Sequence, residues 1–405
     1  MQFTNRDRII FTISTLLVVG FLIFRETLNP LLLILFMAIG LAIAILASEK
    51  AVGGIELLGK KLGLTPYVSG VLSSLASNSP ELAIGAFAIL SGKVEFAIAF
   101  IIIAIGFNIL MLGFLIIIGN FKRKAPILIP EEVVEIEVPI VRVAIVIVGS
   151  IFVLGIVLFA LEVFEIATSP LGEHTIPFLP YEANIIMVVV YLFYLFFIIR
   201  HNLQKKVKTV SNQQQNGEFI AHELTISRTF LISILVLAFA MIFFAGEMIS
   251  SSVELFLEQS HEIGITLNEF QLAFFIGAAA SIPEHAIALL AVRHEGGIEL
   301  GLGNLIAGSM QNLLLMTGLV SLFSFIASLI GISGNDPRGI PLVHEIEGGA
   351  PIPFLLVQFG FAWLLLFLIK SSMTDDRRLD IYEGFTITIA QVFVFVIFLR
   401  GILAF

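Results

Sequence analysis

Long apolar runs recur from one end of this 405-residue sequence to the other. Because the hydrocarbon core of a bilayer is about 30 Å thick, a transmembrane helix needs about 20 predominantly apolar residues. Hydrophobic residues make up 58% of the chain and charged residues only 13%, which is more apolar surface than a soluble fold can bury. We therefore expect an all-α polytopic membrane protein with about 11 transmembrane helices. The candidate spans lie near residues 9–24, 30–47, 67–91, 96–118, 140–163, 185–199, 228–247, 269–292, 302–324, 352–369 and 384–404.

The first apolar run, residues 9–24, follows Arg6 and Arg8 and has the length of a signal peptide's apolar segment. It leads into Arg25 and Glu26 without the small-residue pattern of a cleavage site, so we expect an uncleaved first span. The chain has no cysteine, which excludes disulfides, cysteine-ligated metal sites and a cysteine nucleophile.

The basic residues indicate an orientation, because cytoplasmic loops of membrane proteins are enriched in Lys and Arg. With the N-terminus inside, eleven spans place all but four of the 22 basic residues in inner loops; the exceptions are Arg25, Lys93, Arg338 and Arg400. One helix more or fewer would move many of these basic residues to the outer side, so their uneven distribution supports eleven spans. We expect a multi-pass protein of the cell membrane, with a cytoplasmic N-terminus and an external C-terminus.

Two acids lie within apolar spans, where a charged side chain costs a few kcal/mol and is a functional-site hypothesis by default. Glu81 follows Pro80 in the third span, and Glu284 follows Pro283 in the eighth. Apolar residues continue the span after each acid. A proline inside a helix removes one N–H donor and frees a carbonyl oxygen four residues earlier, which becomes available as a ligand. The two segments look like copies of each other. A simple kink beside a structurally buried acid could explain one Pro-Glu pair, but it is a poor explanation of two pairs at matched positions.

The spacing extends the match into the next span of each copy. Asn108 comes 27 residues after Glu81, and Gln311 comes 27 residues after Glu284. The sequence from Asn108 reads Asn-Ile-Leu-Met-Leu-Gly and the sequence from Asn312 reads Asn-Leu-Leu-Leu-Met-Thr-Gly, so these stretches agree with a slip of one residue. Each copy is a helical hairpin that carries one carboxylate and one carboxamide.

The two copies must cross the membrane in opposite directions, because an odd number of spans separates the third from the eighth. This is an inverted repeat, the architecture in which substrate sites form near the membrane midplane. We expect an extra N-terminal helix in residues 1–28, a first half in 29–200 with its repeat at about 67–118, a cytoplasmic linker in 201–227, and a second half in 228–405 with its repeat at about 268–320.

The acids and amides of the two copies suit a hard divalent cation such as Ca2+, which takes six or more oxygen ligands. Two carboxylates balance the charge of one divalent ion. In the empty site they would repel each other in a low dielectric, which favours binding of protons or Na+ at the same groups. Such mutual exclusion is an antiport mechanism.

These residues resemble the calcium/cation antiporter superfamily, whose members carry two such repeats in inverted orientation with a glutamate in each. The likeness covers the two repeats in sequence and nearly the whole chain in span layout. It implies exchange of Ca2+ for H+ or Na+ by alternating access, with no cofactor besides the transported ions. The ligands implied are Glu81, Glu284, Asn108, Gln311, Asn78, Ser77, Ser281 and Asn312.

The branch of the superfamily is less clear. The Pro-Glu pairs and the Gly-Asn-Leu-Ile sequence at 303–306 are similar to sodium/calcium exchangers. The position of Asn78, the Glu-His-Ala sequence from 284 and the presence of Gln311 are similar to calcium/proton exchangers. Sodium-coupled relatives commonly carry an acid near Gln311, and Ala280 stands where the first copy has a hydroxyl. This loss of Na+ ligands favours protons, and Na+/Ca2+ exchange is the alternative.

Other charged residues are open to more ordinary interpretations. His285 is a candidate proton relay, since imidazole exchanges protons near neutral pH, but a buried, hydrogen-bonded structural histidine is the simpler explanation. The acidic stretch at 131–137 could sense cations, but we expect a solvated loop on the inner side.

The competing functions are a channel and an enzyme. Channels usually form their pathway between symmetric subunits. A broken inverted repeat within one chain instead indicates alternating access. The sequence has no His-Glu-x-x-His metal motif, no phosphate-binding glycine loop and no nucleophile with a base at helical spacing, so we expect no catalytic residues. The expected partners are inorganic cations and the lipid bilayer, not nucleic acid. Two alternatives remain: the protein could form a homo-oligomer, and it could exchange a divalent metal other than Ca2+.

Overall fold

The computed structural model describes the backbone of residues 5–129, 131–163, 178–216, 227–260, 267, 269–291, 297–332, 334, 340–342 and 354–403. Helix α1 (Asn5–Phe24) and the short 3-10 turn η1 (Arg25–Thr27) come first. The helices of the first half are α2 (Pro30–Leu62), α3 (Pro66–Ser77), α4 (Ser79–Leu90), α5 (Val94–Arg123), α6 (Glu131–Val163) and α7 (Tyr181–Asn216). The helices of the second half are α8 (Arg228–Ser260), α9 (Glu269–Ala291), α10 (Gly297–Met310), the π-helical turn η3 (Gln311–Met316), α11 (Thr317–Leu329), α12 (Phe354–Thr374) and α13 (Ile381–Leu403).

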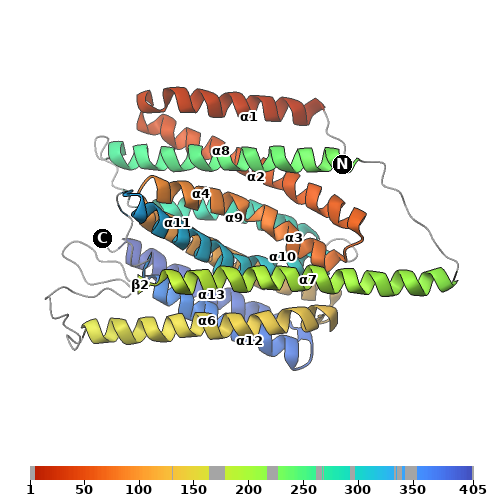
Figure 1. Cartoon of the computed structure of the whole chain (residues 1–405). Coiled ribbons are helices and arrows are strands. Elements are labelled where there is room, and N and C mark those ends of the chain that lie inside the picture. The colour runs from red at the N-terminus through yellow and green to blue at the C-terminus, as the bar shows by residue number, and fades with distance from the viewer. Residues whose placement is uncertain are drawn as a thin grey trace.

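The helices run side by side in one bundle, and α1 begins at the end of the bundle opposite to the end where α13 finishes (Figure 1). Nine helices in the described part of the chain are long and apolar enough to cross a membrane. The two remaining crossings are α3 with α4, which are divided at Asn78, and α9. The protein is therefore the all-α polytopic membrane protein of eleven crossings that the sequence predicts.

Helices α2 and α8 are longer than their apolar runs. Each has 33 residues, which at 1.5 Å per residue is about 50 Å and exceeds the hydrocarbon thickness. The predicted spans ended at residues 47 and 247, where polar residues begin. The helices continue because Glu, Lys and Ser at these positions are compatible with a helix. These polar ends extend beyond the hydrocarbon core of the membrane.

Four short strands show the inverted repeat. Strand β1 (Ile127–Leu128) follows α5 and pairs antiparallel with β4 (Arg378–Leu379), which precedes α13. Strand β3 (Ile340–Pro341) follows α11 and pairs antiparallel with β2 (Phe178–Leu179), which precedes α7. Exchanging the two halves converts the first pair into the second. The basic-residue bias predicts that the loops of each pair share a membrane face, and the pairing confirms this.

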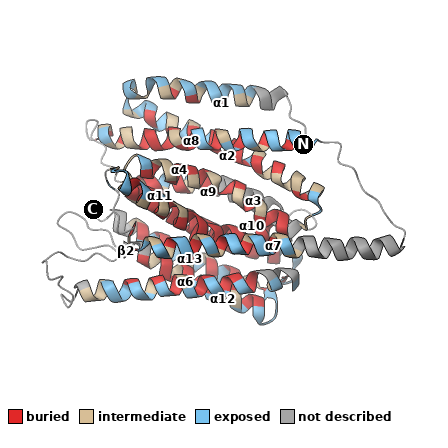
Figure 2. Cartoon of the chain, in the orientation of Figure 1, coloured by how far each residue is buried: buried red, intermediate tan, exposed pale blue. Residues whose placement is uncertain are grey.

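Helix contacts follow the same symmetry. Helix α2 packs against α8, and α6 packs against α12, so that equivalent helices of the two halves meet. Helix α5 packs against α13 as α11 packs against α7. Exposed apolar side chains lie on the outer helices, whereas α3, α4, α5 and the described side chains of α10 are mostly buried (Figure 2). The exposed apolar faces suit a lipid surrounding.

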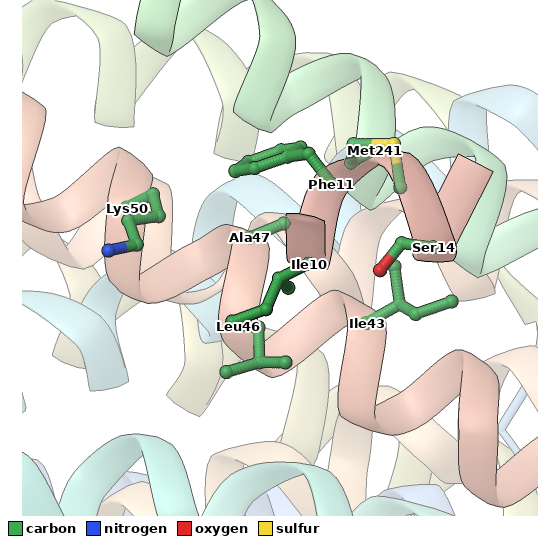
Figure 3. A pocket seen from close by; sticks show the side chains of 8 residues that line it. All are labelled: Ile10, Phe11, Ser14, Ile43, Leu46, Ala47, Lys50 and Met241. Atoms are coloured by element: carbon green, nitrogen blue, oxygen red, sulfur yellow. The ribbon is translucent and has the colours of Figure 1, made fainter. Parts of the chain in front are cut away.

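Helix α1 packs on α2 and α8 at the edge of the bundle. A gap of about 20 Å³ lies between these helices, lined by Ile10, Phe11, Ser14, Ile43, Leu46, Ala47, Lys50 and Met241 (Figure 3). Such a volume holds at most about one water molecule, so the gap is a packing defect and not a ligand site.

The acidic stretch that begins α6 is not the solvated loop that we predicted. Its residues form the first two turns of the helix. Glu131 is exposed and pairs with Arg377 at 3.3 Å, whereas the Glu137 side chain is fully buried. The sequence did not reveal this burial because the partner of Glu137, Tyr194, lies 57 residues further along the chain.

Helices α4 and α8 approach closely at Gly246. A methyl group on Gly246 would lie 2.7 Å from Ala83 Cβ and 2.9 Å from the Ala83 carbonyl carbon, so backbone would have to move. We expect Gly246→Ala to lower the free energy of unfolding by about 1–3 kcal/mol, as overpacking typically does. The measurement is thermal unfolding in detergent. Gly20→Ala is the matched control, because nothing lies within 4 Å of a methyl group at Gly20; equal melting temperatures for the two variants would contradict the prediction.

Candidate cation-binding site

The third crossing is broken at its middle, and the break places Glu81. Helix α3 ends at Ser77 and α4 begins at Ser79, with Asn78 between them. Pro80 lies in the first turn of α4, where its missing N–H removes no helical hydrogen bond. Glu81 lies in the same turn, where the partial positive charge of a helix N-terminus favours a carboxylate. The side chain of Glu81 is 1% exposed.

The carbonyl oxygen that we expected Pro80 to free is already used. The Ala76 oxygen accepts hydrogen bonds from Ser79 Oγ at 2.6 Å and from Ser48 Oγ at 3.3 Å. Hydroxyl groups replace the lost helical donor, as they commonly do at helix breaks within membranes. The Ala76 carbonyl is therefore not free to bind a cation, and the oxygens available at this break belong to side chains.

Asn108 lies at the middle of α5 and is fully buried. Neither atom of its amide forms a hydrogen bond with the described residues. A buried amide without partners costs several kcal/mol in an apolar environment, so such a group in mid-membrane indicates a ligand-binding role.

The amides of the two repeats come together at Gly308 and Gln311. A methyl group on Gly308 would lie 3.4 Å from Asn78 Nδ2 and 3.5 Å from Asn108 Oδ1, so both amides of the first repeat face this glycine of α10. Gln311 Oε1 accepts from Asn78 Nδ2 at 3.3 Å and from Ser74 Oγ at 3.0 Å. The structure thus unites Asn78, Asn108 and Gln311 from spans far apart in sequence.

The π-helical turn η3 begins at Gln311. It lies where the sequence of the second copy is offset by one residue from that of the first. A π turn holds one residue more than an α turn, and such turns often occur at functional sites. The Asn312 carbonyl accepts from Thr317 Oγ1, five residues on, at 2.9 Å. The Asn312 side chain is fully buried, and its amide has no partner within the described residues. The insertion therefore leaves a second amide beside Gln311.

The second copy differs from the first, because α9 continues from Glu269 through Pro283 to Ala291 without a break. Glu284 and His285 lie on this helix, but their side chains are outside the described part of the structure. Ser281 is fully buried, and its hydroxyl has no partner among the described residues. Ser77 is buried and donates to the Ser74 carbonyl at 3.2 Å.

The described part of the site offers amide and hydroxyl oxygens, and Glu81 adds a buried carboxylate three residues after Asn78. No group of three or more His, Cys, Asp or Glu side chains gathers among the described residues. Amide, hydroxyl and carboxylate oxygens are ligands of hard cations, whereas softer metals prefer imidazole and thiolate. The donor set therefore fits an alkali or alkaline-earth cation as cargo.

Two residues of this region were missed by reasoning from the sequence. Ser74 precedes Asn78 by one helical turn, and that spacing within a hydroxyl-rich stretch was the available signal. Gly308 precedes Gln311 by one turn, and a glycine beside a predicted ligand indicates a close approach.

An inverted helical repeat that buries amide oxygens at the middle of its crossings, without partners among the described residues, defines a secondary transporter of small cations. The model of the family "Sodium/calcium exchanger protein" matches residues 32–200 and 230–401. These segments make up most of the chain, which therefore belongs to this family of ion exchangers. No curated protein matches the sequence.

Solved structures of two exchangers share the fold. The structure of the H+/Ca2+ exchanger CAX has 13% sequence identity and a TM-score of 0.64, over 100% of this chain and 94% of that chain. The sodium-calcium exchanger NCX_Mj, soaked with 2.5 mM Na+ and 0.1 mM Ca2+, has 16% identity and a TM-score of 0.55, over 90% of this chain and 98% of that chain. At such low identities the likeness shows the fold and not the transported ions.

Proposed function

We propose that the protein is a secondary active antiporter that exchanges Ca2+ for H+ by alternating access. Its cation site is formed by Glu81 and Asn108 from one half and by Glu284 and Gln311 from the other. The observation that carries this proposal is the meeting of amides from both repeats, those of Asn78, Asn108 and Gln311, at the helix break that also holds Glu81. Oxygen ligands of this kind bind Ca2+.

The neutral side chain of Gln311 supports protons as the counter-ion. Its amide is held by Ser74 and Asn78 at a position where sodium-coupled relatives commonly carry an acid. With two glutamates as the only carboxylates of the proposed site, one divalent cation or two protons each neutralise it. Either occupant removes the repulsion between the acids and excludes the other.

Na+/Ca2+ exchange at the same site is the second candidate. The description of the matching family as a sodium/calcium exchanger favours it. Both candidates predict the same architecture and differ only in the ion that drives transport. We also propose that the face of the β1–β4 pair is cytoplasmic, because the basic loops gather there.

The test is uptake of radiolabelled Ca2+ into proteoliposomes that contain the purified protein. Two outward gradients are applied separately, one of H+ and one of Na+. We expect the H+ gradient alone to drive uptake, with protein-free liposomes as the control. Uptake driven only by Na+ would replace H+ by Na+ in the proposal, and uptake without any counter-ion gradient would indicate a channel.

A further inference from the structure

A cavity of about 520 Å³ lies between α6 and α7, away from the cation site. The two helices lie side by side, but α6 packs closely against α12 and only loosely against α7 (Figure 1). The volume of the cavity is within the roughly 300–1,000 Å³ that small-molecule sites occupy. Its wall is apolar over most of its length, and Glu135 of α6 and His201 of α7 are charged or titratable groups at one end.

The cavity extends through one leaflet of the membrane. The apolar part of α7 runs from Tyr181 to His201, which is 21 residues or about 30 Å and equals the thickness of the hydrocarbon core. His201 therefore lies at the membrane boundary opposite to β2, on the face of the β1–β4 pair. Glu135 lies near the same face, because α6 begins just after β1. From Val190 to His201 the lining covers about 16 Å of α7, so the cavity reaches from this boundary to about the midplane.

The deeper part of the cavity suits a lipid chain. Val143, Phe193 and Phe197 line it, and all three are also exposed at the surface of the bundle. The cavity is therefore accessible from the surrounding lipid. Because an apolar cavity does not hold water, an acyl chain is the occupant that the membrane supplies.

The end of the cavity at the membrane boundary offers acceptors for hydrogen bonds. His201 Nε2 is buried without a partner among the described residues. Glu135 provides an exposed carboxylate. Its backbone carbonyl also loses its helical donor, because Pro139, four residues later, has no N–H. Pro139 lines the cavity too, so this carbonyl lies on the same side of α6. Such a group of acceptors favours a ligand that is positively charged and carries N–H donors.

Basic side chains flank the same end. Arg142 follows Pro139 by three residues on α6, and Arg200 precedes His201 on α7; both are exposed. Long basic side chains at this depth extend to the membrane boundary, where the phosphates of lipids lie. The charges therefore fit a headgroup that has both an amine and a phosphate.

We propose that the cavity binds one phospholipid with a primary-amine headgroup, of which phosphatidylethanolamine is the simplest example. One acyl chain occupies the apolar part of the cavity. The ammonium group donates to Glu135 and His201, and the phosphate lies between Arg142 and Arg200. The lipid fills the space that the loose packing leaves and joins α6 to α7. This inference does not depend on which ion drives transport.

The test is native mass spectrometry of the delipidated, full-length protein in detergent, titrated with three phospholipids that have identical acyl chains. We expect phosphatidylethanolamine to bind at one saturable site, at least about tenfold more tightly than phosphatidylcholine or phosphatidylglycerol. Phosphatidylcholine keeps the charges but has no N–H donors, and phosphatidylglycerol has no amine. We expect Glu135→Gln to weaken binding of phosphatidylethanolamine about tenfold, as the loss of a hydrogen bond to a charged group does.

A second variant tests the apolar part of the cavity. Val143→Trp fills space in the wall without altering the acceptors, and we expect it to abolish the saturable site. The matched control is Glu182→Gln at the start of α7, on the opposite membrane face, which should bind as the wild type does. The melting temperature of each variant without lipid shows whether it is folded. Equal binding of the three lipids, unchanged binding in both cavity variants, or a dimer that excludes lipid would each overturn the proposal; a dimer would indicate that a second copy of the chain covers the cavity.

Discussion

Glu81→Gln is expected to reduce gradient-driven Ca2+ uptake by at least about a hundredfold, which corresponds to about 2.7 kcal/mol. Glutamine has nearly the shape of glutamate, so the first turn of α4 should form as before. It carries no charge to balance a divalent cation, and it cannot take up the proton that replaces that cation. Because Glu81 is 1% exposed, water cannot supply the missing interaction. The measurement is uptake of radiolabelled Ca2+ by the variant under the gradient that drives the wild type.

Glu95→Gln is the matched control for this variant. Glu95 also lies in the first turn of a helix, α5, but far along that helix from Asn108. We expect it to retain most of the wild-type uptake. If Glu81→Gln retained more than about half of the wild-type rate, the cation site would have to be placed elsewhere.

Asn108→Leu is expected to abolish Ca2+ binding and at the same time to stabilise the empty protein. Asn108 buries an amide with no hydrogen-bond partner among the described residues, which costs about 1–3 kcal/mol that an apolar side chain of similar size does not. Loss of the amide removes a ligand oxygen. We therefore expect a higher melting temperature without Ca2+, and no further rise when Ca2+ is added, because only a bound ligand stabilises the folded state.

Asn120 provides the matched control on the same helix. Its Nδ2 donates to the Ile116 carbonyl at 2.8 Å and to the Leu379 carbonyl at 3.0 Å, and it thereby joins α5 to β4. Asn120→Leu should lower the melting temperature and keep the rise caused by Ca2+. A lower melting temperature for Asn108→Leu, with the Ca2+ effect intact, would mean that Asn108 is a structural residue.

The sequence predicted the fold well because the bilayer leaves so few solutions. Apolar runs determine the crossings, and the bias of basic residues determines which loops share a face. The repeat was visible because Glu81 and Glu284 lie inside apolar runs, where any charge is conspicuous. These signals are local or compositional, and they need no knowledge of packing.

The details of the site were less accessible, for reasons that particular residues show. The one-residue slip near Asn312 was visible, but whether a helix absorbs an insertion as a π turn depends on its neighbours. The break at Asn78 and the unbroken helix through Pro283 come from the similar sequences Asn-Ser-Pro-Glu and Ser-Ile-Pro-Glu, so surrounding helices decide the difference. Ser74 resembled any helical serine that bonds its own backbone. Its second acceptor, Gln311, lies 237 residues away.

The unequal halves have a consequence for the resting protein. If the repeats were identical, the states open to either side of the membrane would be related by symmetry and equally populated in the absence of ions. A helix break at Asn78 in one half and a π turn from Gln311 in the other remove that equality. A difference of only about 1.4 kcal/mol between the two states would make one of them ten times more abundant. The protein itself thus sets a preferred facing direction at rest, before any gradient acts on it.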